Sequence, residues 1–149
     1  MGRFSGGMRT TGAGSTTLPL CALCGTASGG GKLREITVWN TTTTAVALKL
    51  MRITTAGTPG AATIVEAPWD KQNEGAPVCA LFDTYTSTAP TAGDDLGIRI
   101  TLPGAVGAGA TRGFGDTGII IPAGTANGIA LVAATGAGQI VDVDWVWDE

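Results

Sequence analysis

Histidine is absent from this sequence of 149 residues, and charged side chains make up only 14% of it. Histidine is the side chain that most often transfers protons near neutral pH, so the Ser-His-Asp and Cys-His arrangements of nucleophilic catalysis are excluded. A domain that faces water on all sides normally has about a quarter of its residues charged. The low value indicates that much of the surface contacts other molecules.

Long hydrophobic runs are also missing. No run of 18 apolar residues occurs, and no apolar stretch follows the charged residues near the N-terminus. A membrane-spanning helix needs about 20 such residues, and a secretory signal needs a shorter apolar segment. We therefore expect no membrane partner and no export. The net charge of −3 gives no general attraction to nucleic acid, so we expect no direct contact with it.

The three cysteines, Cys21, Cys24 and Cys79, are an odd number, so at least one thiol stays outside any intrachain disulfide. The first two form a C-x-x-C pair, but glycine and serine follow where a thioredoxin-like motif requires a helix. In an extended segment their spacing places the two side chains on opposite faces. We expect buried, unreactive thiols, with a disulfide as the alternative. Zinc would require ligands pooled from several copies.

Small residues are abundant: the chain contains 24 glycines, 23 threonines and 22 alanines. Threonine favours strands, and glycine is useful in turns. Residues 1–17 show no apolar periodicity, and a second glycine-rich stretch spans residues 25–31. We therefore expect residues 1–31 to form an extended N-terminal arm and residues 32–149 to form the folded domain.

From residue 32 onward, short apolar or alternating runs are separated by turn residues. The predicted strands span residues 33–39, 45–53, 62–66, 78–86, 95–102, 117–121, 128–134 and 139–147, with a turn-rich connection at 103–115 and a possible helical turn at 68–74. Strands joined by turns pair mainly antiparallel and bury their apolar faces best as two packed sheets. The expected fold is an all-β antiparallel β-sandwich of jelly-roll type, with an immunoglobulin-like sandwich as the alternative.

Alternation is strictest in residues 95–102 and 139–147. In the last predicted strand, Val141, Val143, Trp145 and Trp147 fall on one side and two aspartates on the other. We expect this strand to close the core.

Paired carboxylates are the remaining candidates for acid and base chemistry: Asp94 with Asp95, and Asp142 with Asp144. The first pair lies in a glycine turn and the second on an outer strand face, so we interpret both as solvated or interface acids. Calcium could use Asp94, Asp95 or Asp116, but the sequence contains no EF-hand loop. We expect no enzyme, no cofactor and no metal site.

The segment GFGDTG at residues 113–118 matches the pattern G-x-G-x-x-G. A dinucleotide site needs a helix after this loop, and the β-branched run that leads into Pro122 disfavours one. We therefore interpret the segment as a turn.

Charge is distributed unevenly along the chain. Residues 1–52 contain six basic residues and one acidic residue, whereas residues 53–149 contain three basic and eleven acidic residues. Either the two halves pair within one molecule, or the basic front of one copy, including Arg3 and Arg9, docks on acidic groups of a neighbour.

The chain has four tryptophans but a single tyrosine. Trp39, Trp145 and Trp147 fall in predicted strands, where they would belong to the core or to a subunit contact, and Trp69 falls in a loop that suits binding. The candidate interface residues are Arg3, Phe4, Arg9, Trp39, Trp69, Trp145 and Trp147. Tryptophans exposed side by side on one face would indicate a sugar-binding module.

Two stretches, LREITVWNTTTTAVALKLMRITTAGTPGAA and GFGDTGIIIPAGTANGIALVAATGAGQIVDVDWVWDE, resemble small structural proteins of tailed bacteriophage virions. The resemblance covers about residues 33–149 and rests on the strand-and-turn pattern and the WDE ending. It implies a non-enzymatic head decoration (cement) protein, made in the host cytoplasm, that assembles as a homotrimer on the capsid surface and binds the major capsid protein. A tail or fibre component, or a carbohydrate-binding sandwich, is the alternative.

Within this interpretation, residues 1–31 would act as a clamp across seams between capsid subunits, and the sandwich would form a knob. Deleting residues 2–17 is then expected to weaken attachment to the particle.

Overall fold

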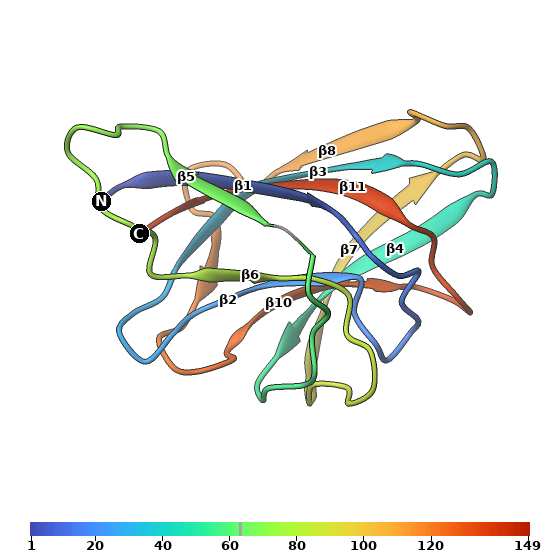
Figure 1. The fold of residues 1–149 in the computed structure, drawn as a ribbon, viewed down its shortest axis with the longest axis horizontal. Helices are drawn as coiled ribbons and strands as arrows, with labels where there is room; N and C mark the ends of the chain where they lie inside the picture. The colour runs from blue at the N-terminus through green and yellow to red at the C-terminus, as the bar shows by residue number, and fades with distance from the viewer. Residues whose placement is uncertain (63) are drawn as a thin grey trace.

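A computed structural model describes residues 1–62 and 64–149, and these residues form strands and turns without a helix. The strands are β1 (Arg3–Arg9), β2 (Cys21–Cys24), β3 (Gly31–Asn40), β4 (Val46–Ile53), β5 (Val65–Pro68), β6 (Ala80–Phe82), β7 (Ala92–Leu102), β8 (Gly109–Gly113), β9 (Ile119–Ile121), β10 (Gly128–Ala133) and β11 (Val141–Asp148). They build two antiparallel sheets packed face to face (Figure 1). The prediction of an all-β antiparallel sandwich is confirmed.

We name each sheet after its central strand. The β11 sheet has the order β5-β1-β11-β3-β8, with β9 also paired to β3, and the β10 sheet has the order β6-β2-β10-β4-β7. Leaving out the short strands β5 and β6, the orders become β1-β11-β3-β8 and β2-β10-β4-β7. The chain therefore alternates between the two sheets from β1 to β4.

The core lies between the two sheets and is anchored by Trp145 and Trp147, which are fully buried on the inner face of β11. Phe4 from β1 stacks on Trp147 with 6.0 Å between ring centroids. All three were named as candidate interface residues, and the structure corrects this because their side chains are buried inside one chain. For Trp145 and Trp147 the alternative of a core position is the one confirmed. The alternation predicted for residues 95–102 and 139–147 is confirmed by the burial of β7 and β11.

The N-terminal segment differs most from the expectation. β1 pairs with β11 from Arg3 opposite Asp148 to Arg9 opposite Asp142, and β5 pairs with its other edge. β2 pairs with β10 on one side and β6 on the other. Residues 1–31 therefore contribute strands to both sheets, and the structure has no extended arm in this segment.

β1 was not predicted from the sequence because a glycine occupies one of its inward positions. Phe4, Gly6 and Met8 are buried at alternate positions of the strand, so the strand has a normal inward face. A side chain on Gly6 would collide with Leu81 from β6, which fills the space that the glycine leaves. The apolar alternation is therefore present, but Leu81 supplies its middle side chain.

Loops cover the outer face of the β10 sheet. Ala22, Cys24, Ala130 and Val132 point away from the main core and form a second buried cluster with Tyr85, which follows β6. The Tyr85 amide donates a hydrogen bond of 3.0 Å to the carbonyl of Pro19. This second cluster fixes the loops against the sheet.

Asp83 joins three loops at this covered face. It is fully buried and accepts hydrogen bonds from the amides of Thr11 (3.0 Å) and Ala62 (3.2 Å). The hydroxyl groups of Thr11 and Thr84 also donate to its carboxylate. The segments after β1, before β5 and after β6 therefore share one carboxylate.

Two connections also differ from the sequence prediction. The turn-rich residues 103–115 contain β8, which pairs with β3 through residues such as Thr111 opposite Thr37. Residues 68–74 form a turn in which the Glu74 amide donates to the Asp70 carbonyl at 3.0 Å, and it does not extend into a helix.

Ion pairs connect the basic front of the chain to its acidic back within one molecule. The Asp148 carboxylate pairs with the guanidinium groups of Arg3 (N–O distance 2.7 Å) and Arg34 (2.8 Å). Asp142 pairs with Arg9 at 2.7 Å, and Asp95 pairs with the Lys49 ammonium group at 3.2 Å. These pairs favour the intramolecular explanation of the charge asymmetry. They also engage Arg3 and Arg9, the residues that the alternative explanation would dock on a neighbouring copy.

Candidate binding face

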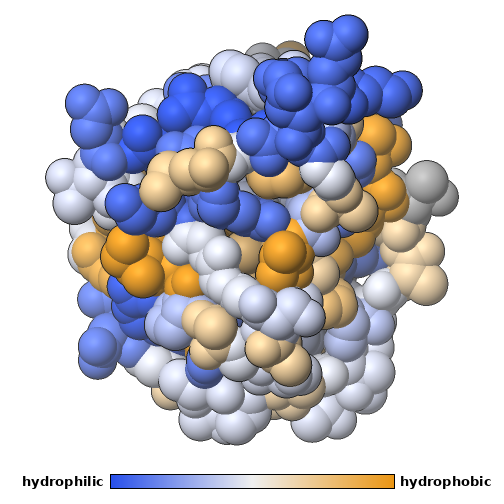
Figure 2. Space-filling view, turned by 90° about the vertical axis from the view of Figure 1, so that its left-hand side faces the viewer, coloured by the Kyte–Doolittle hydropathy of each residue, from blue (hydrophilic) through white to orange (hydrophobic). Residues whose placement is uncertain are grey.

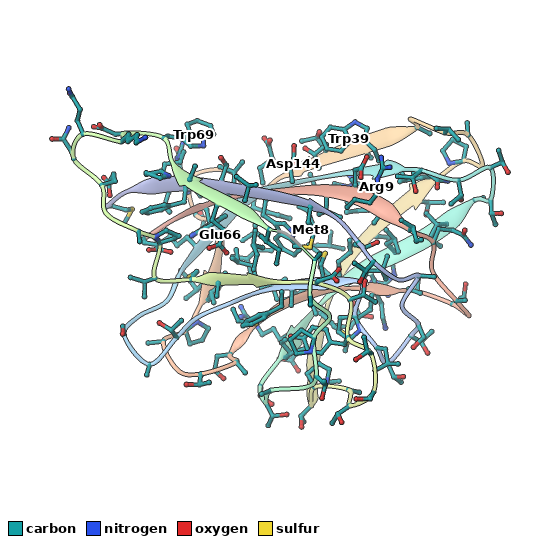
Figure 3. All side chains as sticks on the ribbon, in the orientation of Figure 1. Met8, Arg9, Trp39, Glu66, Trp69 and Asp144 are labelled. Atoms are coloured by element: carbon teal, nitrogen blue, oxygen red, sulfur yellow. The ribbon has the colours of Figure 1, made fainter. Side chains whose placement is uncertain are left out.

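The outer face of the β11 sheet carries an open groove with a volume of about 400 Å³. Alternation along the central strands directs every second side chain outward, and Figure 3 shows Trp69, Asp144 and Trp39 following one another along this face. The residues that line the groove, which we call the outer groove, are Ser5, Gly6, Gly7, Glu35, Thr37, Val65, Ala67, Trp69, Asp144 and Val146. Its floor is low because β1 contributes only a serine and glycines there.

Trp69 lies at one end of the outer groove with 60% of its surface exposed. Its amide donates a hydrogen bond of 2.8 Å to the Arg3 carbonyl, and the Arg3 guanidinium carbon lies 5.5 Å from the indole centroid. Arg3 in turn donates to both carboxylate oxygens of Asp148, at 2.7 and 3.3 Å. The exposed ring is thus oriented by a backbone bond and a cation–π contact before any ligand arrives.

Trp39 lies at the opposite end of the same face, next to a second depression that Arg9 and Asp142 also line. Arg9 donates two hydrogen bonds of 2.7 Å to Asp142, and Asp142 is the partner of Trp39 in the sheet register. The indole packs over Gly109, where any side chain would collide with it. Six residues of β1 separate the two ends, which corresponds to about 20 Å at the usual rise of a strand.

Two carboxylates lie between the tryptophans and make no ion pair among the described residues: Asp144 and Glu35. Burial, followed by the nearby charge of Asp142, raises the pKa of the Asp144 carboxyl. The hydrogen bond from Arg9 lowers the pKa of Asp142 instead. The middle of the face therefore offers hydrogen-bond acceptors without a cationic partner.

Hydroxyl groups complete this polar surface. The hydroxyl oxygens of Thr37 and Thr111 lie 2.9 Å apart. Ser5 lines the groove from β1, on the other side of β11. The arrangement can hydrogen-bond a polar ligand along three adjacent strands.

The structure gathers four of the seven predicted interface residues on this face. Arg3 and Trp69 meet at one end, and Arg9 and Trp39 lie together at the other. The sequence prediction missed Asp144 and Glu35 as parts of a groove, although it placed Asp144 on an outer strand face. Predicting the groove would have required the pairings of β1 with β11 and of β11 with β3.

The candidate acid Asp95 and the glycine motif at residues 113–118 have structural roles, in ion pairs and in a turn. Asp95 accepts hydrogen bonds from Arg99, which lower the pKa of its carboxyl, and also pairs with Lys49. Residues 113–118 form the predicted turn, closed by a hydrogen bond of 3.1 Å from the Gly118 amide to the Phe114 carbonyl. In the part of the chain that the structure covers, no cluster of three or more His, Cys, Asp or Glu suits a metal ion.

The three cysteines are buried free thiols. Cys21 points into the main core and Cys24 into the second cluster, so the prediction of opposite faces is confirmed. The alternative of a disulfide is not what the structure shows. Burial raises the pKa of the Cys24 and Cys79 thiols to about 12 and that of Cys21 further still.

We expect the native protein to resist thiol alkylation because the reactive species is the thiolate, which burial both shields and disfavours. Treatment with iodoacetamide at pH 8 should add no carbamidomethyl group to the folded protein and three groups in guanidinium, as measured by intact mass. Labelling of the folded protein, or fewer than three groups in denaturant without a reductant, would contradict this description.

Comparison with protein families, curated proteins and solved structures found no match to this chain. In the residues described, no helix has the length and hydrophobicity needed to span a membrane.

Proposed function

We propose that the protein is a non-enzymatic structural subunit of a phage particle, a head decoration protein that binds the major capsid protein on the outer lattice. The observation that carries this proposal is the low content of charged residues, 14% of the chain, together with the pairing of many of the basic ones. Five of the nine basic residues, Arg3, Arg9, Arg34, Lys49 and Arg99, are in ion pairs with acids of the same chain.

The remaining surface consists largely of small, uncharged residues. In Figure 2, a broad pale area of intermediate hydropathy covers the lower part of the face, below the strongly hydrophilic and hydrophobic side chains. The centres of protein interfaces are depleted in charge, since removing water from charged groups is costly. A surface of glycine, threonine and alanine loses water at a smaller cost and suits repeated contacts in a lattice.

The proposed attachment uses a rigid body. β1 is held on both edges, and the amides of Gly2 and Glu149 donate to each other's carbonyls at 2.8 and 2.9 Å. Contacts with the capsid therefore come from the faces and turns of the sandwich, and self-association as a homotrimer at a capsid symmetry axis is part of the proposal. A tail or fibre position is the alternative within the virion.

The test is to measure the mass of the purified protein in solution and then its return to particles from which it has been stripped. We expect a mass of about three chains and saturable binding to heads that raises their melting temperature. Binding to purified tails but not to heads would favour the tail alternative. A monomer that binds neither would overturn the proposal.

A further inference from the structure

We propose that the outer groove, together with the depression beside Trp39, is a binding site for a neutral linear oligosaccharide. This inference goes beyond capsid attachment and rests on a different surface property. It is argued from the ring of Trp69, from the unpaired acceptors between the two tryptophans, and from the shape of the face.

The first argument is the orientation of an exposed aromatic ring. The face of a pyranose presents C–H groups of partial positive charge, and the face of an indole is the negative part of its quadrupole. Trp69 is 60% exposed yet fixed by the Arg3 carbonyl and guanidinium. A ring held in this way loses little freedom on binding, so stacking on it is favourable.

The second argument is the chemistry between the tryptophans. Sugar hydroxyl groups donate hydrogen bonds, and the carboxyl groups of Asp144 and Glu35 are acceptors that have no ion-pair partner among the described residues. Hydrogen bonds to charged acceptors are stronger than those between neutral groups. Ser5 and Thr37 add hydroxyl groups that both donate and accept.

These acids also set the selectivity. An anionic glycan would face Asp144 and Glu35 without compensation, because Arg3 and Arg34 are engaged by Asp148, and Arg9 by Asp142. Repulsion of this kind is a common source of specificity. The site is therefore expected to reject chains of uronic acids.

A lysine-rich peptide would also be attracted to the two carboxylates, but the flanks of the face disfavour it. The cation of Arg3 already lies over the Trp69 ring, and the guanidinium groups of Arg9 and Arg34 lie at the two ends. A cationic side chain stacked on Trp69 would meet another cation. A neutral sugar meets no such penalty.

The shape of the face fits a chain that runs along it. The outer groove is an open surface trough on β1, β11 and β3, and no wall closes it where β1 contributes Ser5 and Gly7. Trp69 lies at one end of the outer groove and Trp39 lines the separate depression, so the two rings are not side by side. Their offset along the strand direction is about 20 Å, a length that several linked pyranose rings span. Side chains on central strands keep their positions better than those on loops, which suits a preformed site.

The experiment uses the full chain and defined probes: the hexasaccharides of β-1,4-linked glucose, of β-1,4-linked N-acetylglucosamine and of α-linked mannose. Hexagalacturonate serves as the anionic contrast and hexalysine as the cationic one. Binding is measured by titration calorimetry and by tryptophan fluorescence, on the wild-type protein and on Trp69→Ala and Asp144→Asn. Ile120→Ala, which removes a half-exposed apolar side chain on β9 outside the groove, is the matched control.

We expect saturable binding of at least one neutral hexasaccharide, weakened about tenfold or more by Trp69→Ala and by Asp144→Asn, and unchanged in Ile120→Ala. Unchanged melting temperatures would show that all three variants stay folded. The proposal is overturned if no neutral hexasaccharide binds, if Trp69→Ala binds as tightly as wild type, or if only hexalysine or hexagalacturonate binds. Attachment to stripped particles, measured separately, can succeed or fail independently of this result.

Discussion

Removal of residues 2–17 is expected to abolish folding of the sandwich. β1 is an interior strand of the β11 sheet, with β11 on one edge and β5 on the other. Its loss removes two ladders of hydrogen bonds and uncovers the core side of Trp147, on which Phe4 stacks. Buried apolar side chains the size of Phe4 and Met8 contribute about 1.5–3 kcal/mol each, and domains are stable by only about 5–15 kcal/mol.

The measurement is far-ultraviolet circular dichroism and soluble yield of the shortened chain. A matched control inserts Gly-Ser-Gly-Ser after Gly136, in an exposed turn where nothing packs against the glycine, and this variant should fold normally because longer surface loops cost little. A shortened chain that folds like the wild type but fails to bind particles would instead support the extended arm.

Asp83→Ala is expected to destabilise the protein by about 3–5 kcal/mol, a large effect for a single substitution. The alanine leaves the amides of Thr11 and Ala62 and the Thr11 hydroxyl without their acceptor, in a place where little water can replace it. Each unsatisfied donor costs about 1–3 kcal/mol. The loops that these residues belong to also cover Tyr85 and the second cluster.

Urea denaturation measures this change. Asp83→Asn keeps the volume and one acceptor oxygen, so it should fall between alanine and wild type. Asp116→Ala removes an exposed carboxylate whose pair with Arg34 is long at 3.8 Å, and it should leave the midpoint unchanged. A shift of less than about 1 kcal/mol for Asp83→Ala would show that the three loops do not depend on this carboxylate.

The strands that the sequence predicted well are those whose inward positions all carry apolar side chains, such as Leu96 to Leu102 in β7. β1 was missed because Gly6 occupies an inward position. β2 was missed because all four of its residues are buried, Cys21 in the main core and Cys24 in the second cluster, which gives a continuous apolar run without alternation. β8 has a single apolar residue, Ala110, among glycine and polar residues, and its strand conformation comes from pairing with β3.

The candidate site was predictable in its parts but not as a whole. A tryptophan in a polar loop indicated exposure at Trp69, and the alternation of β11 placed Asp144 on an outer face. The groove forms because Gly7 lies opposite Asp144, and Asp144 opposite Thr37. These neighbours are more than 100 residues apart in the chain, so local patterns contain no information about their contact.

The central place of β11 also has a consequence for biosynthesis. β1 leaves the ribosome first, yet the strand that fills the space between β1 and β3 is the last to emerge. Folds dominated by such distant pairings close slowly, since the entropy of a long loop is lost before the contacts form. The early strands must therefore stay soluble until β11 has been made, and a segment rich in threonine and glycine, without long apolar runs, is suited to remaining soluble over that time.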